Sequence, residues 1–228
     1  MKKGKLIVIE GTDCSGKETQ TKMLVERLNK ENIKATRLSF PMYDTPTGKI
    51  VGGPYLGKEY ISKCWFDEGA VEVDPKVAAL YYGADRLYNL PKMKKMLDCG
   101  VNVILDRYVE SNFAHQGGKI FTKEERYEMY KWLETLEYGL LELPRPDQII
   151  FLYVPYQYAL ELKKNRGECL DQHESSEAHL KNAEASYLEL VELYNFVKID
   201  CINEFGIKTK KEINDDIYNN VKKIIKKK

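Results

Sequence analysis

The chain has 228 residues, of which 43% are hydrophobic and 31% charged, a composition typical of a globular protein that buries its own core. Its 36 Lys and Arg residues nearly match its 35 Asp and Glu residues, and the net charge of +1 gives no support for a nucleic-acid or membrane-surface role. The composition also excludes a collagen-like chain, general disorder and a disulfide scaffold.

Short apolar runs alternate with longer amphipathic stretches along the chain. The apolar runs predict five strands, at Lys5–Glu10, Ala35–Phe40, Val101–Leu105, Gln148–Val154 and Phe196–Ile199. The amphipathic stretches predict helices at Lys17–Asn29, Pro75–Leu97, Thr122–Leu141, Pro155–Lys164, Ser176–Tyr194 and Lys210–Lys227. Thr122 with Glu125, and Thr209 with Glu212, have the spacing of capping boxes. Pro91 is expected to kink or split its helix.

This alternation of strands and helices predicts an α/β fold, with a five-stranded parallel sheet covered by helices on both faces. Ligands of such folds bind at the carboxyl ends of the strands. We therefore expect the chemistry to lie just after residues 10, 40, 105, 154 and 199 of a single domain spanning 1–228.

A phosphate-binding motif follows the first predicted strand directly. Gly11, Gly16 and Lys17 have the Gly-x4-Gly-Lys spacing, between a strand and a helix. The backbone N–H groups of such a loop converge on an anion, and its lysine places a cation on the outer phosphates. We expect the whole loop to bind a phosphoryl donor; its residues are Gly11, Thr12, Asp13, Cys14, Ser15, Gly16, Lys17, Glu18 and Thr19.

One position of the motif is unusual, because Glu18 stands where a serine or threonine hydroxyl normally binds magnesium. Glu18 could itself ligate Mg²⁺, or Thr19 or a water could replace the hydroxyl, or the site could bind nucleotide without turnover. A carboxylate beside a polyphosphate is repelled unless a cation lies between them, so the first two interpretations need magnesium.

Polar and aromatic residues follow the other predicted strands. Asp106 can hold magnesium or an acceptor oxygen, and Arg107 can bind a phosphate with its forked guanidinium, although a plain Asp–Arg ion pair is the structural alternative. Aromatic side chains from Phe40–Tyr43 and Tyr81–Arg86 could enclose a base, with Arg86 fixing a monophosphate. Two anion sites in one cleft indicate phosphoryl transfer between nucleotides.

Two further segments are polar and basic. Residues 163–177 follow the fourth strand and its helix, and could form a lid that brings a cation to the transferring phosphate or simply a solvated loop. The lysine-rich end, 222–228, is interpreted as the solvated last turn of a helix rather than a nucleic-acid contact.

Together these motifs resemble those of the thymidylate kinase family, whose members make dTDP from dTMP and ATP. The resemblance runs from Ile9 to the last helix. The matching residues are 9–13, 16–20, Phe40 and Pro41, Thr47 and Gly48, 84–86, 106–108, Ser111, Ala114, Gln116, 143–147 and 171–179. The resemblance implies a P-loop kinase fold, a three-layer sandwich with a short lid, that uses ATP and Mg²⁺ and forms a homodimer.

The resemblance also implies roles for residues on the donor side. Lys17 and the loop amides would hold the ATP phosphates, and Asp13 would contact the acceptor's 3′-hydroxyl. Arg166, helped by Lys163 or Lys164, would stabilise charge on the transferring group. Lys17, Asp13, Arg166 and Arg107 are thus the catalytic set, with Glu18 and Asp106 near the metal.

On the acceptor side, the same resemblance assigns each residue to a part of dTMP. Phe40 and Tyr82 would pack around thymine, and Arg86 and Gln116 would contact its edge. Arg107 and Tyr43 would position the phosphate. The remaining implied contacts, to the base or the sugar, are Ser111, Asn112 and His115.

Three departures from the family pattern keep other functions open. Cys14 stands where glycine or arginine is common, Tyr43 where many members have arginine, and His115 where a tyrosine usually blocks the sugar's 2′-position. With Glu18, these departures leave two alternatives, a related kinase with another acceptor and a nucleotide-binding regulatory protein without turnover.

The five cysteines form no CxxC pair, and the chain has only three histidines, so a structural zinc site is not expected. The apolar run Leu6–Ile9 is too short for a signal peptide, and no window reaches the length of a membrane span. We expect a reduced, cytoplasmic protein with no nucleic-acid or membrane partner, and the resemblance implies dTMP and ATP as its substrates.

Overall fold

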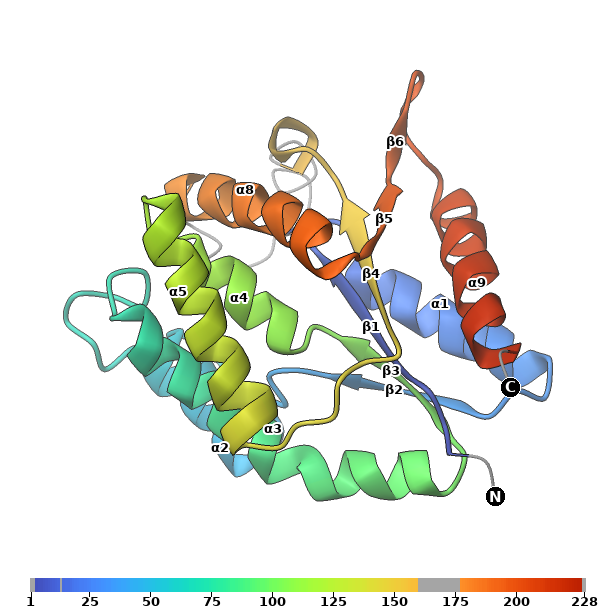
Figure 1. Cartoon of the computed structure of the whole chain (residues 1–228), viewed down its shortest axis with the longest axis horizontal. Helices are drawn as coiled ribbons and strands as arrows, with labels where there is room; N and C mark the ends of the chain where they lie inside the picture. The colour runs from blue at the N-terminus through green and yellow to red at the C-terminus, as the bar shows by residue number, and fades with distance from the viewer. Residues whose placement is uncertain (1–2, 13, 160–176, 227–228) are drawn as a thin grey trace.

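The computed structural model describes residues 3–12, 14–159 and 177–226 (Figure 1). Five parallel strands form the central sheet in the order β2-β3-β1-β4-β5. Their bounds are β1 (Leu6–Gly11), β2 (Ala35–Ser39), β3 (Asn102–Asp106), β4 (Gln148–Tyr153) and β5 (Val197–Asp200). The predicted five-stranded parallel sheet is confirmed, and no strand end differs from its predicted position by more than one residue.

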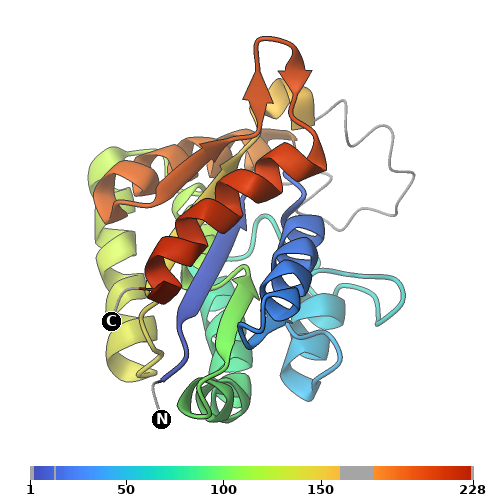
Figure 2. The same ribbon diagram turned by 90° about the vertical axis from the view of Figure 1, so that its right-hand side faces the viewer.

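Helices cover both faces of the sheet, as Figures 1 and 2 show. The helices α1 (Lys17–Lys30) and α9 (Lys210–Lys226) lie side by side on one face. The other face is covered by α3 (Pro75–Asp98), α4 (Val109–Gly117), α5 (Lys123–Glu134) and α8 (Glu177–Tyr194). The three-layer α/β sandwich is therefore confirmed.

The alternation of side chains along β1 explains why both faces need cover. Leu6 and Val8 pack with α3, α4, α5 and α8, whereas Ile7 and Ile9 pack with α1 and α9. All four side chains are buried, so the strand is apolar throughout instead of alternating with polar residues. Burial of each such side chain contributes roughly 1.5–3 kcal/mol.

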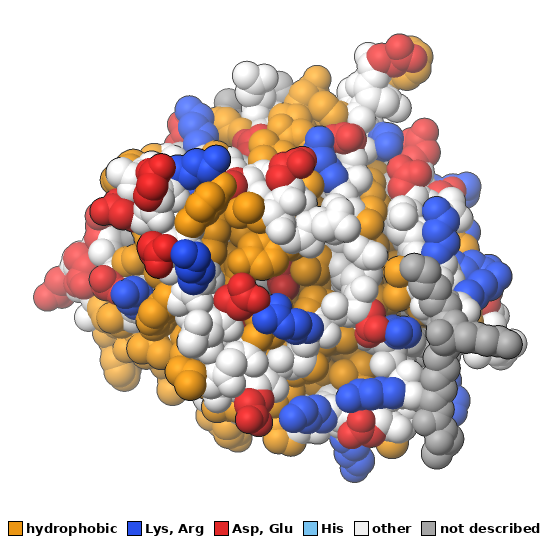
Figure 3. All heavy atoms as spheres, viewed as in Figure 1, with side chains coloured by type: hydrophobic (Ala, Val, Ile, Leu, Met, Phe, Trp, Pro, Cys, Tyr) orange, Lys and Arg blue, Asp and Glu red, His pale blue; other side chains and the backbone are white. Residues whose placement is uncertain are grey.

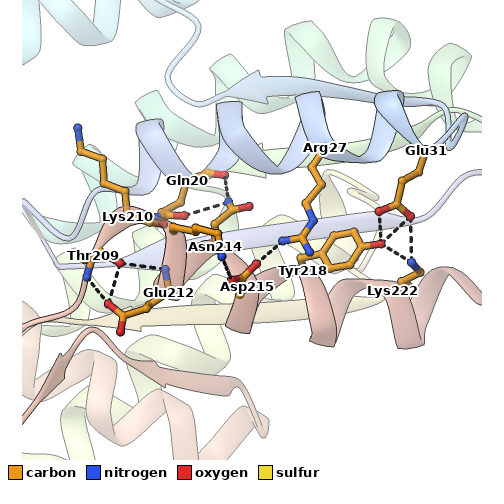
Figure 4. A network of polar contacts seen from close by, with 11 residues as sticks. Gln20, Arg27, Glu31, Thr209, Lys210, Glu212, Asn214, Asp215, Tyr218 and Lys222 are labelled. Atoms are coloured by element: carbon orange, nitrogen blue, oxygen red, sulfur yellow. Dashed lines mark hydrogen bonds and ion pairs between the residues drawn. The ribbon is translucent and has the colours of Figure 1, made fainter.

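Polar contacts fasten α9 to α1, the helix that starts at the phosphate loop (Figure 4). Asn214 donates to the Gln20 side chain at 3.0 Å, and Arg27 forms an ion pair with Asp215 at 2.6 Å. The predicted capping box is confirmed, because Thr209 donates to the Glu212 carboxylate at 2.7 Å and the Glu212 N–H donates back at 3.2 Å.

Of the two outcomes expected at Pro91, the split does not occur, because α3 runs unbroken from Pro75 to Asp98, and the kink stays a prediction. Leu90 and Met93 on either side are buried in the core, and this packing compensates for the hydrogen bond that proline cannot donate. Residues 156–159 are helical, and the rest of the helix predicted at 155–164 lies outside the described residues.

Five short elements were not predicted. They are α2 (Pro46–Ile50), the π-helical turn η1 (Val51–Tyr55), α4 (Val109–Gly117), and the hairpin strands β6 (Ile202–Asn203) and β7 (Gly206–Ile207), whereas the π-helical turn η2 (Thr135–Leu140) falls within the helix predicted at 122–141. Each is too short for a hydrophobic period to show in the sequence. The hairpin projects from the top of the molecule in both ribbon views (Figures 1 and 2). None of the helices in the described ranges is long and apolar enough to cross a bilayer.

Candidate active site

A cleft of about 840 Å³ lies at the carboxyl ends of β1, β2 and β3. It brings together twelve of the residues predicted from the sequence: Lys17, Glu18, Phe40, Tyr43, Tyr82, Arg86, Asp106, Arg107, Ser111, Asn112, His115 and Gln116. The location agrees with the rule that parallel sheets bind ligands at this edge. Asp13, Lys163, Lys164, Arg166 and residues 163–176 of the predicted lid lie outside the described residues.

The phosphate loop forms a tight turn between β1 and α1. A Cβ atom on Gly11 would lie 2.5 Å from the Ser15 hydroxyl and 2.7 Å from the Leu152 carbonyl oxygen, so only glycine fits there. Gly16 has φ +80°, a conformation that side chains disfavour. Lys17 lies within the loop and donates to the carbonyl oxygens of Gly11 at 3.0 Å and Thr12 at 2.8 Å. The loop therefore holds the lysine ammonium where phosphates would bind.

The two predicted metal ligands line the same cleft in different settings. Glu18 lies in the first turn of α1, is largely exposed and pairs with Lys22 at 2.7 Å. Asp106 is nearly buried and pairs with Arg37 at 2.6 Å. Within the described residues, no group of three or more metal-ligating side chains comes together. Magnesium in kinases is commonly bound by one or two carboxylates, phosphates and water, and two carboxylates of one cleft fit that donor set.

Arg37 is a cleft residue that the sequence analysis missed. Besides its pair with Asp106, its Nε donates to the Thr21 hydroxyl at 2.8 Å, which ties β2 to α1. The ion pair of Asp106 is thus made with β2 and not with the adjacent Arg107. A charged side chain in the middle of a predicted strand was the available signal.

Arg107 is presented by a strained turn after β3, where it has φ +65°. Its Nη1 lies 3.4 Å from the Ser111 hydroxyl and 3.2 Å from His115 Nε2. The next N–H along the chain, that of Tyr108, donates to a carboxylate oxygen of Glu10 at 2.8 Å. This hydrogen bond helps to hold the turn that aims Arg107 into the cleft.

Glu10 is the second residue that the sequence analysis missed. Its carboxylate is fully buried and accepts hydrogen bonds from the Ser111 N–H at 3.1 Å, the Ser111 hydroxyl at 2.6 Å and the Tyr187 hydroxyl at 2.8 Å. It therefore satisfies N–H groups at the start of α4 that have no partner within the helix. A charge at the end of an apolar strand was the signal in the sequence.

Arg86 is buried in the cleft wall and its charge is already paired. Its Nε donates to Glu137 at 2.9 Å, its Nη2 also bonds Glu137, and its Nη1 donates to the Tyr108 carbonyl oxygen at 3.3 Å. A neutralised guanidinium offers N–H donors but little net charge. These contacts argue against Arg86 as a ligand for a monophosphate and favour the contact with a neutral base edge that the family resemblance implies.

Two amide side chains beside Arg86 have polar atoms with no partner. Oδ1 of Asn112 and both amide atoms of Gln116 are buried without a hydrogen bond. Both residues line the cleft and lie four positions apart on α4, and therefore on the same side of that helix. Such atoms are rare in folded proteins unless a ligand or water pairs with them. They fit a ligand with its own donors and acceptors, such as a nucleobase.

Aromatic rings form another part of the cleft wall. Tyr82 packs edge-on against Tyr55 at 5.7 Å, and Tyr55 also contacts Tyr81 and Phe66 at 6.0 Å. Residues 57–74, to which the sequence assigned no role, contribute Phe66 to this cluster from behind the cleft. Lys119 fastens the same segment, because its ammonium donates to the carbonyl oxygens of residues 70 and 73 at 3.2 and 2.8 Å.

Comparison with known proteins gives a consistent result. The family model described as thymidylate kinase matches residues 9–213. A thymidylate kinase of Plasmodium falciparum is 30% identical over 223 residues, which cover 98% of this chain and 92% of the relative. A probable thymidylate kinase of Methanocaldococcus jannaschii is 30% identical over 218 residues, 96% of each chain. The solved structure of a thymidylate kinase from Candida albicans is 24% identical and has a TM-score of 0.74 over 97% of this chain and 92% of its own, so the two share a fold.

Proposed function

Because the chain belongs to the thymidylate kinase family, we propose that its cleft transfers the γ-phosphoryl group of ATP to the 5′-phosphate of dTMP, giving dTDP and ADP. One observation carries this proposal: the phosphate loop, the Arg107 turn and the unpartnered amides of α4 all meet at one cleft. The chain is a nucleoside monophosphate kinase. The other acceptors and the binding-only protein considered above gain no support from the described residues.

The proposed reaction needs no general base, because the attacking phosphate oxygen of the acceptor dTMP is already anionic. Catalysis then rests on positioning and on charge stabilisation. We propose that the Lys17 ammonium leaves the carbonyl oxygens of its own loop and binds the outer phosphates of ATP. Arg107 would orient the acceptor phosphate in line with them. The roles of Asp13 and Arg166 stay predictions, since both lie outside the described residues.

Glu18 and Asp106 are the residues that would hold Mg²⁺. The bound ion neutralises charge on the transferring phosphates. Asp106 is fixed by Arg37, whereas Glu18 is exposed at the start of α1 and would exchange its contact with Lys22 for one with the ion.

The acceptor half is proposed to enclose the base between rings. Phe40 is buried directly after β2, and Tyr82 lines the cleft from α3. Gln116 and Arg86 would contact the base edge, with Asn112 beside them. The three remaining contacts, to sugar or phosphate, would come from Tyr43, Ser111 and His115.

A homodimer is the proposed assembly, with α3 at its interface. Four large apolar side chains on one stripe of α3 are 40–57% exposed: Val77, Leu80, Leu87 and Tyr88. On the face shown in Figure 3, hydrophobic side chains gather over α3 and α5 at the lower left. A second copy of the chain would bury this stripe. The cytoplasmic location stays a prediction.

A coupled ADP-release assay tests the proposed reaction. ATP and Mg²⁺ are supplied with dTMP, dUMP, UMP, CMP, dGMP or AMP, and we expect strong turnover with dTMP. Turnover with another acceptor alone would move the function to a related kinase. Silence with every acceptor while ATP still binds would favour a protein that holds nucleotides without turnover.

A further inference from the structure

Glu137 lies directly behind the acceptor half of the cleft, in the π-helical turn η2, and is not part of the cleft lining. Its side chain is fully buried. Its carboxylate accepts from Nε and Nη2 of Arg86, and also from Nδ2 of Asn112 at 2.8 Å. One buried carboxylate thus holds two side chains that line the cleft, from α3 and from α4.

The first consequence concerns Arg86. Two of its three nitrogens are committed to Glu137, and the third, Nη1, donates to the Tyr108 carbonyl oxygen at 3.3 Å. The guanidinium is planar and rigid, so fixing two nitrogens fixes the direction of the third. Each of the two terminal nitrogens carries a second N–H, so Arg86 still has a donor to present to the cleft. Because the charge of its guanidinium is compensated by Glu137, it is a poor ligand for a phosphate.

The second consequence concerns Asn112. A carboxylate only accepts hydrogen bonds, so the NH₂ group of the Asn112 amide must face Glu137. The same NH₂ group donates to the Ala79 carbonyl oxygen at 3.3 Å. Oδ1 therefore points away from Glu137, and it is the atom left buried without a partner. The contact with Glu137 thereby fixes the orientation of the Asn112 amide, so that Asn112 offers the cleft a hydrogen-bond acceptor and not a donor.

From these contacts we infer that Glu137 is a positioning residue that selects an acceptor base with a carbonyl next to a ring N–H. The inference rests on the proposed function and deepens it. The site offers a donor from Arg86 and an acceptor from Asn112, which complement the C4 carbonyl and N3–H of thymine and uracil. Cytosine has an NH₂ group at C4 and an unprotonated N3. Its NH₂ group would face the donor of Arg86, and its N3 would face the acceptor oxygen of Asn112. A polar site rejects such a mismatch strongly, because its buried groups are left unpaired.

Replacement of Glu137 by glutamine tests this inference, because the two side chains have the same shape. The amide NH₂ of the glutamine would face a donor of Arg86 or of Asn112, which disturbs Arg86 in the first case and turns the NH₂ of Asn112 toward the base in the second. We expect the KM for dTMP to rise about tenfold or more and the preference for dTMP over dCMP in kcat/KM to fall about tenfold or more, while the KM for ATP stays within about twofold.

The control is Glu134→Gln. Glu134 also pairs with an arginine, Arg145 at 2.7 Å, and lies one turn earlier in the same helical segment, but it is partly exposed and outside the cleft. This variant should match the wild type in all three quantities. Glu137→Asp keeps the carboxylate on a shorter side chain, and it should raise the KM for dTMP yet retain the preference for dTMP over dCMP.

A folded Glu137→Gln enzyme that keeps the wild-type preference for dTMP over dCMP would overturn the inference, even if its activity fell, because a merely structural role lowers both acceptors together. If this variant does not fold, Asn112→Ser removes the amide that Glu137 orients; an unchanged preference there would overturn the inference equally. A wild-type enzyme without dTMP turnover would instead contradict the proposed function.

Discussion

Lys17 is the cation that the phosphate loop is built to hold, and its replacement gives the most direct residue-level prediction. We expect Lys17→Met to lower kcat about 100- to 1000-fold, as loss of one stabilising contact to a transition state does. Its affinity for dTMP, measured by calorimetric titration, should change little because the acceptor half is intact. Lys30→Met, at the exposed end of the same helix, is the control. A variant that retains more than a tenth of the wild-type kcat would argue against the role of Lys17.

The buried carboxylate of Glu10 accepts hydrogen bonds from the turn that presents Arg107. We predict that its replacement lowers the stability of the protein as well as its activity. In Glu10→Gln, an amide NH₂ would face N–H or hydroxyl donors around the buried carboxylate. The free energy of unfolding, measured by urea denaturation, should fall by about 2–4 kcal/mol. The exposed Glu26→Gln on α1 should leave it unchanged. If Glu10→Gln is as stable as the wild type, the carboxylate does not hold the turn.

Glu110 makes stability depend on pH in the neutral range. Burial, with the negative charge of Glu10 nearby, raises the pKa of Glu110 from 4.5 to about 7. The Tyr138 hydroxyl donates to one of its oxygens, and the other oxygen is buried without a partner. Because the folded state holds this proton more tightly than the unfolded state, the contribution to stability is complete below pH 4.5 and is lost as the pH rises through 7.

The expected loss for this one group is about 3 kcal/mol between pH 4.5 and pH 8.5. Glu110→Gln resembles the protonated form and cannot ionise. Unfolding free energies at pH 6 and pH 8.5 should therefore show a smaller decrease for this variant than for the wild type. An equal decrease in both proteins would mean that Glu110 does not titrate in this range.

At the scale of elements, the long periodic segments were predictable and the short ones were not. β1, α1 and α9 follow from apolar runs, capping signals and helical spacing, since local pattern and burial agree there. The split expected at Pro91 does not occur, because the packing of Leu90 and Met93 outweighs a local propensity. The turns η1 and η2 have no signature that distinguishes them from α-helix in the sequence.

The site shows the same division. Residues within or beside a spaced motif, such as Lys17, Arg107 and Gln116, could be selected from the sequence. Arg37 offered only its charge within a predicted strand as a signal, and Glu137 offered none, because their roles come from partners far away in the chain, Asp106 and Arg86. For Arg86 the sequence left two roles open, a phosphate contact and a base-edge contact, and the carboxylate of Glu137, which only the fold brings near, favours the second.

The exposed stripe of α3 carries a prediction about assembly. In the double variant Leu80→Glu with Leu87→Glu, like charges from two copies would meet at the interface and oppose their association. Light scattering after gel filtration should give the mass of two chains for the wild type and of one chain for the variant. Lys223→Glu, on α9 at the other face of the sheet, should remain a dimer. A wild-type protein with the mass of one chain at micromolar concentration would contradict the proposed interface.

At the scale of the whole molecule, one sheet edge joins the two halves of the reaction. β1 ends in the phosphate loop, and its neighbour β3 ends in the Arg107 turn. Glu10 at the end of β1 binds N–H groups beyond β3, so the two loops are connected by a buried contact. The polar contacts between α9 and α1, Arg27 with Asp215 and Asn214 with Gln20, hold in place the helix that begins at the phosphate loop (Figure 4).

The central claim is that this single cleft binds ATP and dTMP together. The measurement that tests it most directly is inhibition by a dinucleotide in which adenosine and thymidine are joined through five phosphates. We expect it to bind at least about a hundredfold more tightly than either substrate, because one molecule then gains both sets of contacts, and to compete with both ATP and dTMP. Competition with only one substrate, at an affinity no better than that of the substrate itself, would contradict the account.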